Sequence, residues 1–143
     1  MQSVFSKISP ITFLFALLVL PLFTSCKKDK DQPSVAKSLV GEWEVEAFLL
    51  DGVDYKGTVV TESELEFKAE KNGSAEFKWF IAYSDGDSET IRGKYEVDED
   101  DEVIELKPTG GIRLELEYDL DGNELELTGI LDGQDFEMVA EKQ

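Results

Sequence analysis

Residues 112–120 read Ile-Arg-Leu-Glu-Leu-Glu-Tyr-Asp-Leu, and apolar and polar side chains alternate along this stretch without a break. Alternation with a period of two is typical of a β-strand with one face in a core and the other in water. Asp121-Gly122-Asn123 follows, a sequence typical of a tight turn between antiparallel strands. The stretch therefore predicts a strand from Ile112 to Leu120 with these side chains inward: Ile112, Leu114, Leu116, Tyr118 and Leu120.

The same pattern recurs on both sides of this strand, from residue 39 to residue 140, with turn residues between the runs. It predicts seven further strands, at residues 41–50, 63–69, 75–83, 90–97, 103–107, 125–131 and 136–140, and a ninth if residues 53–58 pair with a neighbour. Because each strand is joined to the next by a short turn, an antiparallel meander is favoured. Eight such strands can close into a barrel without unpaired edges, with room inside for side chains or one small ligand. We predict an all-β, up-and-down, eight-stranded barrel.

Two of these strands depart from strict alternation. In the first, Trp43, Val45, Ala47 and Leu49 form the predicted inner face, but Phe48 and Leu50 make residues 47–50 continuously apolar. Phe80 and Ala82 interrupt the polar face of another strand in the same way. Such interruptions indicate a bulge, burial under a loop or a contact surface.

The composition excludes several classes of catalytic and metal site. The chain has 143 residues, 32 acidic and 14 basic side chains, one cysteine and no histidine, and its formal net charge is −18 at pH 7. It therefore lacks the residues of a Ser-His-Asp triad, a Cys-His dyad, a Cys/His zinc site or an internal disulfide. Strong negative charge also repels nucleic-acid phosphates. We expect one domain that is not an enzyme, needs no cofactor or metal, and binds no nucleic acid.

The N-terminal residues predict export. Lys7 precedes an apolar stretch at residues 11–23, which is shorter than the ~20 residues of a spanning helix and fits the apolar part of a signal peptide. Leu22-Phe23-Thr24-Ser25-Cys26 resembles a bacterial lipobox. The resemblance implies that residues 1–25 are removed, that Cys26 is acylated with chains such as palmitate, and that residues 26–38 form a charged tether. An ordinary signal peptide with an incidental cysteine is the alternative.

The lipobox resemblance also implies a location. Lys27, rather than an aspartate, follows the cysteine, and in Gram-negative lipoproteins this favours sorting to the outer membrane. The membrane is then a partner through the lipid anchor. Exposure to the periplasm and exposure on the cell surface are both consistent with the sequence.

The opening of the first strand carries a further resemblance. Leu39-Val40-Gly41-Glu42-Trp43 follows one predicted helical turn at residues 33–39, and it resembles the G-x-W entry motif of the calycins, more closely that of the lipocalin-like domain of many bacterial lipoproteins. The resemblance implies a lipocalin-like barrel over residues 39–143, with Gly41 and Trp43 as structural motif and Trp43 as a plug. It also implies a basic residue across the tryptophan, for which Lys142 and Arg113 are the candidates.

Two main functions remain open. The first is binding of a small apolar ligand inside the barrel, lined by Phe67, Phe77, Trp79, Tyr95, Leu116, Tyr118 and Phe136. The second is a barrel with a filled core that acts as a protein-interaction or envelope accessory module. Carbohydrate binding through exposed aromatic side chains is a third hypothesis, and an interior cavity separates the first two.

Acidic runs at residues 85–89, 98–102 and 119–124 offer oxygen ligands, but none has the EF-hand spacing. Asp, Asn and Gly are also the residues that hairpin turns require. We interpret the runs as turns and keep weak cation binding at residues 98–102 as the alternative.

The charge leads to a prediction about salt. From Ser38 onward the chain has 30 acidic and 9 basic side chains, so the folded domain carries a net charge of −21. A compact state with this charge is destabilised by self-repulsion, and salt screens charges more than about 8–10 Å apart. We expect the melting temperature to rise by several degrees from about 10 mM to about 150 mM sodium chloride. Calcium chloride matched in ionic strength is the control, and a much larger rise with micromolar calcium would instead indicate a metal site.

Overall fold

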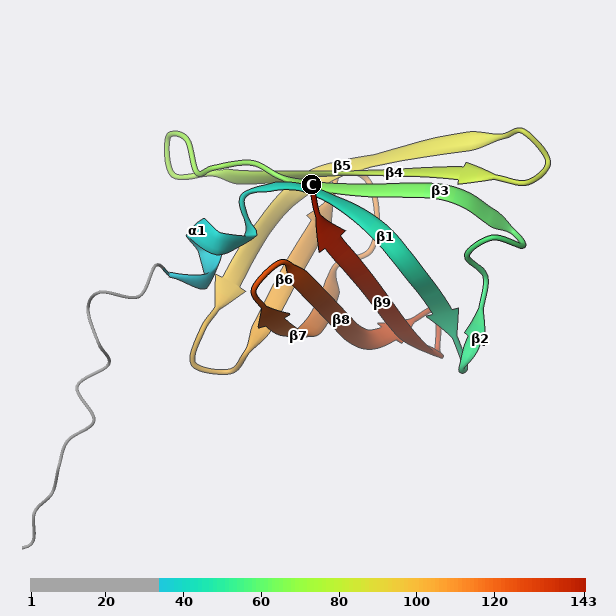
Figure 1. The fold of residues 1–143 in the computed structure, drawn as a ribbon. Coiled ribbons are helices and arrows are strands. Elements are labelled where there is room, and N and C mark those ends of the chain that lie inside the picture. The colour runs from blue at the N-terminus through green and yellow to red at the C-terminus, as the bar shows by residue number, and fades with distance from the viewer. Residues whose placement is uncertain (1–33) are drawn as a thin grey trace, which may run out of the picture. The chain divides into compact units, whose positions relative to one another are not determined.

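The computed structural model describes residues 34–143 of the chain (Figure 1). The signal peptide, Cys26 and most of the predicted tether lie outside the described residues. In the described part, no helix is both long and apolar enough to cross a bilayer. The elements are α1 Val35–Leu39, β1 Gly41–Leu50, β2 Val53–Asp54, β3 Val60–Phe67, β4 Ala75–Tyr83, β5 Ser88–Asp98, β6 Val103–Pro108, β7 Leu114–Asp121, β8 Glu124–Leu131 and β9 Gln134–Lys142.

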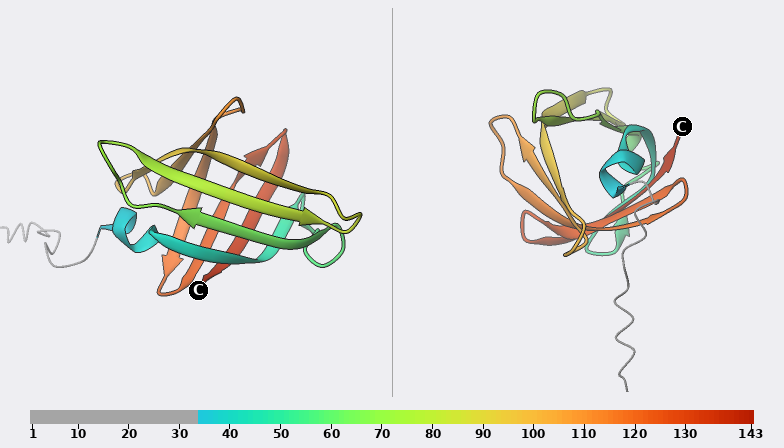
Figure 2. Two further views of the ribbon diagram at one scale, coloured as in Figure 1. Left: turned by 90° about the horizontal axis from the view of Figure 1, so that it is seen from above. Right: turned by 90° about the vertical axis from the view of Figure 1, so that its left-hand side faces the viewer.

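The strands form one antiparallel sheet that closes on itself. Their order is β2-β1-β3-β4-β5-β6-β7-β8-β9, and β1 also pairs with β9. Closure involves eight strands, while the two-residue β2 pairs only with the end of β1. Figure 2 shows the resulting ring, with α1 at one end. The predicted all-β, antiparallel, eight-stranded barrel is confirmed, and of residues 53–58 only Val53 and Asp54 form the extra strand.

A bulge in β1 changes which of its side chains point inward. Val45 pairs with Ala140 and Ala47 with Val139, so Glu46 is an extra residue without a partner in β9. Beyond the bulge the alternation is inverted, and Phe48 is buried in the core. The prediction that Ala47 and Leu49 point inward is therefore wrong, and the continuous apolar run marks the bulge.

Two other predicted strand boundaries are also wrong. β6 pairs with β7 only as far as Leu106 opposite Leu114, so Ile112 has no partner in a ladder, lies in the turn and is 75% exposed. β3 ends at Phe67, which leaves Ala69 in an exposed turn. In both places the connection is longer than the turn residues alone indicate.

The barrel has two different ends. The helix end holds α1, the C-terminus and the turns at residues 68–74, 99–102 and 122–123. The mouth end holds the turns at residues 51–52, 84–87, 109–113 and 132–133. Side chains in the middle of the barrel are buried, and several inward-facing apolar residues near the ends, such as Ile91, Leu120 and Leu131, are only partly buried.

Trp43 packs at the helix end and connects α1 to the barrel. Its ring is 0% exposed, and its Nε1 donates a hydrogen bond to the Leu39 carbonyl at 2.8 Å. Lys142 Nζ lies 5.2 Å from the ring centroid, within cation–π distance, and donates to the Ser38 carbonyl at 2.6 Å. A Cβ at Gly41, whose φ is 138°, would lie 3.0 Å from Lys142 Cε. Of the two basic candidates, Lys142 is the one that lies across the tryptophan.

We expect Trp43→Ala to lower the free energy of unfolding by about 3–5 kcal/mol, because the substitution leaves a large cavity between α1 and the barrel. Denaturant unfolding followed by circular dichroism measures the change. Ile130→Ala, at a side chain that is 58% exposed, is the control and should change stability by less than about 0.5 kcal/mol. Equal effects of the two substitutions would contradict the role given to Trp43.

Candidate functional site

The residues predicted to line a ligand cavity meet in the barrel interior, where they cover one another. Six of the seven are at most 4% exposed: Phe67, Phe77, Trp79, Tyr95, Leu116 and Phe136. The ring centroids of Phe67 and Tyr95 are 4.9 Å apart, and those of Trp79 and Phe136 are 6.3 Å apart. Tyr118 is half-buried near the helix end. These side chains form a packed core in this structure.

Phe48 belongs to the same core and was missed because of the bulge in β1. Its ring centroid lies 6.0 Å from that of Trp79 and 5.5 Å from that of Phe136. Aromatic pairs at these separations attract one another beyond the effect of burial alone. The cluster of Phe48, Trp79 and Phe136 fills the interior between β1, β4 and β9.

The polar atoms of the core aromatics are bonded within the protein. Trp79 Nε1 donates to the hydroxyl of the fully buried Ser63 at 2.9 Å, and the Tyr95 hydroxyl donates to the Lys68 carbonyl at 3.0 Å. Burial raises the pKa of Tyr95, and the negative charge of Glu70 raises it further. These groups are therefore satisfied without a ligand.

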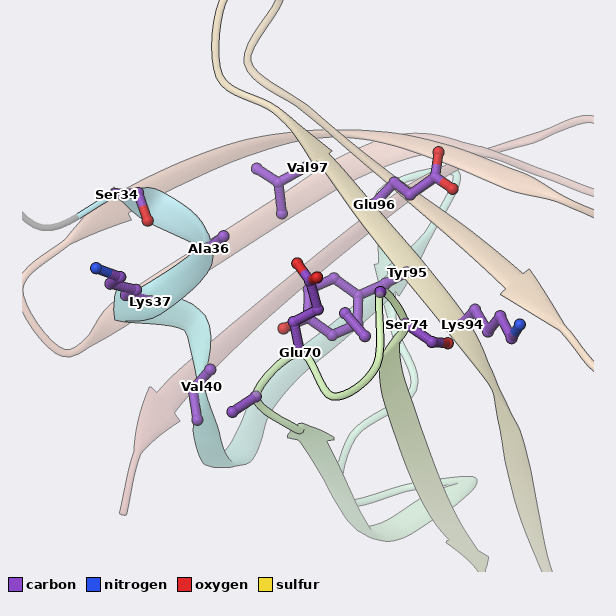
Figure 3. A pocket seen from close by; sticks show the side chains of 13 residues that line it. Ser34, Ala36, Lys37, Val40, Glu70, Ser74, Lys94, Tyr95, Glu96 and Val97 are labelled. Carbon is purple, nitrogen blue, oxygen red and sulfur yellow. The ribbon is translucent and has the colours of Figure 1, made fainter.

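A pocket of about 740 Å³ lies at the helix end, between α1, the turn joining β3 to β4, and β5 (Figure 3). Its charged lining is balanced, with Lys37 and Lys94 against Glu70 and Glu96. The buried hydroxyl of Ser74 also lines it and has no hydrogen-bond partner among the described residues. The lining of this pocket therefore combines charged and apolar side chains.

A second pocket, of about 590 Å³, lies at the mouth end; we call it the mouth pocket. The start of β5, the turn at residues 109–113 and the end of β8 surround it. Ile91, Leu114 and Leu131 line it; they are half-buried and continue the inward-facing rows of their strands. Ile112 and Ile130, 75% and 58% exposed, lie at its rim. The mouth pocket offers accessible apolar surface from inside and outside the barrel.

From the sequence alone, the apolar residues that line the mouth pocket are expected in the core, with the exception of Ile130. The alternation within a strand does not show where its neighbouring strands end. The positions of these apolar residues next to the predicted turns at residues 84–87, 108–111 and 132–133 were the available indication of an end of the barrel. The two arginines of the mouth pocket were not predicted as a pair.

Ion pairs hold the turn beside the mouth pocket. Arg113 pairs through Nε with Glu105, and its Nη2 lies 3.9 Å from a Glu115 carboxylate oxygen. Lys107 Nζ lies 3.2 Å from Glu105 and 2.9 Å from Glu96. The hydrogen bond from Lys107 lowers the pKa of Glu96, and the same bond raises the pKa of Lys107. This network lies on the outer face of β5, β6 and β7.

The turn between β4 and β5, also at the mouth end, carries a polar contact. The Tyr83 hydroxyl donates to a carboxylate oxygen of Glu89 across the turn between β4 and β5. Burial, followed by the bond to Glu89 and the charges of Glu89 and Asp85, raises the pKa of Tyr83 to about 12. Tyr83 therefore stays neutral and continues to donate at physiological pH.

The acidic turns are held by their own carboxylates. Asp98 Oδ1 accepts from the backbone N–H groups of Asp100 and Asp101, at 3.0 and 3.2 Å, and Asp85 Oδ1 accepts from that of Asp87 at 3.0 Å. Within residues 34–143, no group of three potential metal ligands is positioned to hold an ion. The bonds are those of turns in which an aspartate caps the backbone.

The sequence identifies the family. Residues 39–128 match the lipocalin-like domain, so the chain belongs to this family of barrels. Among curated proteins, none matches the chain.

Three solved structures are similar in fold. A lipocalin-like protein from Bacteroides uniformis ATCC 8492 has a TM-score of 0.50 and 18% identity, over 73% of this chain and 98% of its own. The redesigned β-barrel mFAP1, bound to DFHBI, has a TM-score of 0.54 and 20% identity, over 75% of this chain and 97% of its own. The redesigned β-barrel mFAP0, also bound to DFHBI, has a TM-score of 0.53 and 20% identity, over 73% and 98%.

Proposed function

We propose that this protein is a lipid-anchored lipoprotein of the cell envelope, most simply of the outer membrane, whose barrel binds a small apolar ligand in the mouth pocket. The observation that carries the binding proposal is the apolar surface of Ile91, Leu114 and Leu131, accessible at one end of an otherwise packed barrel. Lipocalin-like barrels are in general binding proteins rather than enzymes, which supports this class of function.

The mouth pocket suits an apolar ligand better than the centre of the barrel does. A ligand there covers half-buried side chains and the exposed rim isoleucines without displacing the aromatic cluster. Each ~100 Å² of apolar surface removed from water contributes about 2.5 kcal/mol. A volume of about 590 Å³ lies in the range of small-molecule sites.

The helix-end pocket is the weaker candidate. It is larger, at about 740 Å³, but its rim carries two lysines and two glutamates. Apolar ligands gain little from such a rim, because its charges must keep their contact with water.

The similar barrels mFAP1 and mFAP0 support the proposal by analogy, since both were solved bound to DFHBI. A barrel of this fold and size is therefore compatible with holding a small molecule. At 20% identity the analogy concerns the fold, and the residues that contact a ligand in this chain have to be argued from its own pocket.

A filled-core barrel that serves as a protein-interaction module is the second candidate. The packed centre and the exposed Ile112 and Ile130 favour it, because exposed apolar side chains are common in contact surfaces. In this case the rim would bind a partner, and no small molecule would enter the pocket.

We expect Leu114→Trp to weaken binding of the neutral apolar dye Nile red to the full-length protein by about tenfold or more, or about 1.4 kcal/mol. The indole would occupy the space between β5 and β8 that the ligand needs. Ile130→Glu, at the exposed rim, should weaken binding without disturbing the fold. Fluorescence titration measures the affinity.

Val97→Trp is the matched control, because Val97 is also half-buried and inward-facing but lines the helix-end pocket. It should leave the dye affinity unchanged. If only Val97→Trp weakened binding, the ligand site would lie at the helix end. If wild-type protein bound no apolar dye, the interaction module would be the better explanation.

The anchor is tested separately. Cys26→Ser should abolish incorporation of a palmitate analogue and release the protein from the membrane fraction, since stable anchoring requires the acyl chains. Ser25→Ala keeps a small residue before the cysteine and should label normally. Undiminished label on Cys26→Ser would refute the lipobox.

A further inference from the structure

We propose that the barrel lies against an anionic phospholipid surface with the outer face of β4 and β5 towards the lipid headgroups. We call this the basic face; it carries Lys78, Arg92 and Lys94, with Phe80 beside them. The inference rests on the proposed function, because the lipid anchor is what brings the barrel to the bilayer. It names the side of the barrel that contacts the membrane and the groups it contacts there, the phosphates of the lipids.

The register of the strands brings the cations of the basic face together. Core residues alternate with them along β4 and β5, so all three point outward. Lys78 is directly opposite Arg92. Lys94 follows two residues after Arg92 and is directly opposite Lys107 of β6. Four of the nine basic residues from Ser38 onward therefore form one continuous group across three strands.

The three cations of the basic face are not bound by carboxylates. Lys107 is paired with two glutamates. Within residues 34–143, by contrast, no carboxylate lies within ion-pair distance of Lys78, Arg92 or Lys94. Glutamates are the direct neighbours of Lys78 in β3 and of Lys94 in β4, and they offset part of the charge without making such a pair. Lys78 and Arg92 repel each other across the ladder, and lipid phosphates would relieve this repulsion.

The side of the barrel away from the basic face repels an anionic surface. Five carboxylates form a row of direct cross-strand neighbours from β3 through β1, β9 and β8 to β7: Glu64, Glu44, Glu141, Glu124 and Asp121. Figures 1 and 2 show β8 and β9 on the opposite side of the barrel from β4. A negatively charged surface would therefore turn the barrel until β4 and β5 face it.

Phe80 adds an apolar contact to the basic face. It faces outward two residues after Lys78, is only partly buried, and lies directly opposite Thr90 in a regular part of the ladder. The interruption of the polar pattern at this residue is thus not a bulge but an aromatic side chain on the outer surface. Aromatic side chains next to lysines and arginines are the combination with which protein surfaces bind at the headgroup level of a bilayer.

The tether is short enough to keep the basic face near the headgroups. Eight residue steps separate Cys26 from Ser34, and an extended chain spans at most ~3.6 Å per residue, which gives ~29 Å. Ser34 and Lys94 both line the helix-end pocket, so the tether joins the barrel across this pocket from one end of the basic face (Figure 3). Proximity matters because the attraction of lysine and arginine to anionic lipids falls off within a Debye length, ~8 Å at physiological ionic strength.

A fluorescent label on the acylated protein tests the orientation. Cys26 is the one cysteine of the chain and its thiol is consumed by acylation, so an introduced cysteine is the single site for labelling. Thr90→Cys places the dye NBD on the basic face, and Thr128→Cys places it on the outer face of β8. The labelled proteins are inserted into preformed phosphatidylcholine vesicles, with or without about a third phosphatidylglycerol. A lipid with a nitroxide headgroup in both kinds of vesicle quenches NBD on contact.

We expect the label at residue 90 to be quenched about twofold more than the label at residue 128 in the anionic vesicles, and this excess to be absent from the neutral ones. Salt at about 500 mM should remove the excess. Lys78→Gln combined with Arg92→Gln should also remove it. Lys68→Gln combined with Lys71→Gln is the matched control, because it changes the net charge equally in the exposed turn between β3 and β4, and it should keep the excess.

The outcomes separate the orientation from the anchor. Equal quenching of the two labels in anionic vesicles would overturn the inference and leave the basic face to an acidic protein partner. The same excess in neutral vesicles, or the same loss in both double variants, would also overturn it. Failure of the acylated protein to float with either kind of vesicle would overturn the proposed anchor, and the inference with it.

Discussion

The pairing of β1 with β9 is the constraint on which the rest of the structure depends, because it converts a meander into a closed barrel. Trp43 and Phe48 are five residues apart, an odd number, so a regular strand would place them on opposite faces. The extra residue at Glu46 brings both to the inside. Trp43 can then support α1 and Lys142 at the helix end while Phe48 joins the aromatic cluster in the interior.

Much of this fold is predictable from the sequence, since alternation and turn residues depend on neighbours in the chain. Leu125 and Leu127 illustrate this, for their inward direction follows from their own strand. Phe48 could not be placed in the same way, because a period of two does not say where an extra residue is inserted. Ile112 was misplaced for a related reason, since the length of a ladder is set by the partner strand.

The site is less predictable than the fold. Phe67 and Ile91 occupy equivalent inward positions in their strands, yet Phe67 is buried and Ile91 lines a pocket. On one side of Ile91 the strand β4 continues, but on the other side β6 ends at Pro108, opposite Gly93, which leaves Ile91 beside the turn at residues 109–113. The turn at residues 109–113 lies beside the start of β5 only because β6 returns along β5 and Thr109 N donates to the Arg92 carbonyl. Such proximity is a property of the assembled barrel.

A packed centre and a binding function are compatible when the ligand binds at an end. A ligand in the middle would have to separate Phe48, Trp79 and Phe136, whose pairwise contacts contribute about 0.5–1.5 kcal/mol each beyond area burial. If only a minor population were open in this way, the apparent affinity would fall by that fraction. The mouth pocket requires no such opening. The same packing that stabilises the barrel therefore favours an end of the barrel, rather than its centre, as the place for the proposed ligand.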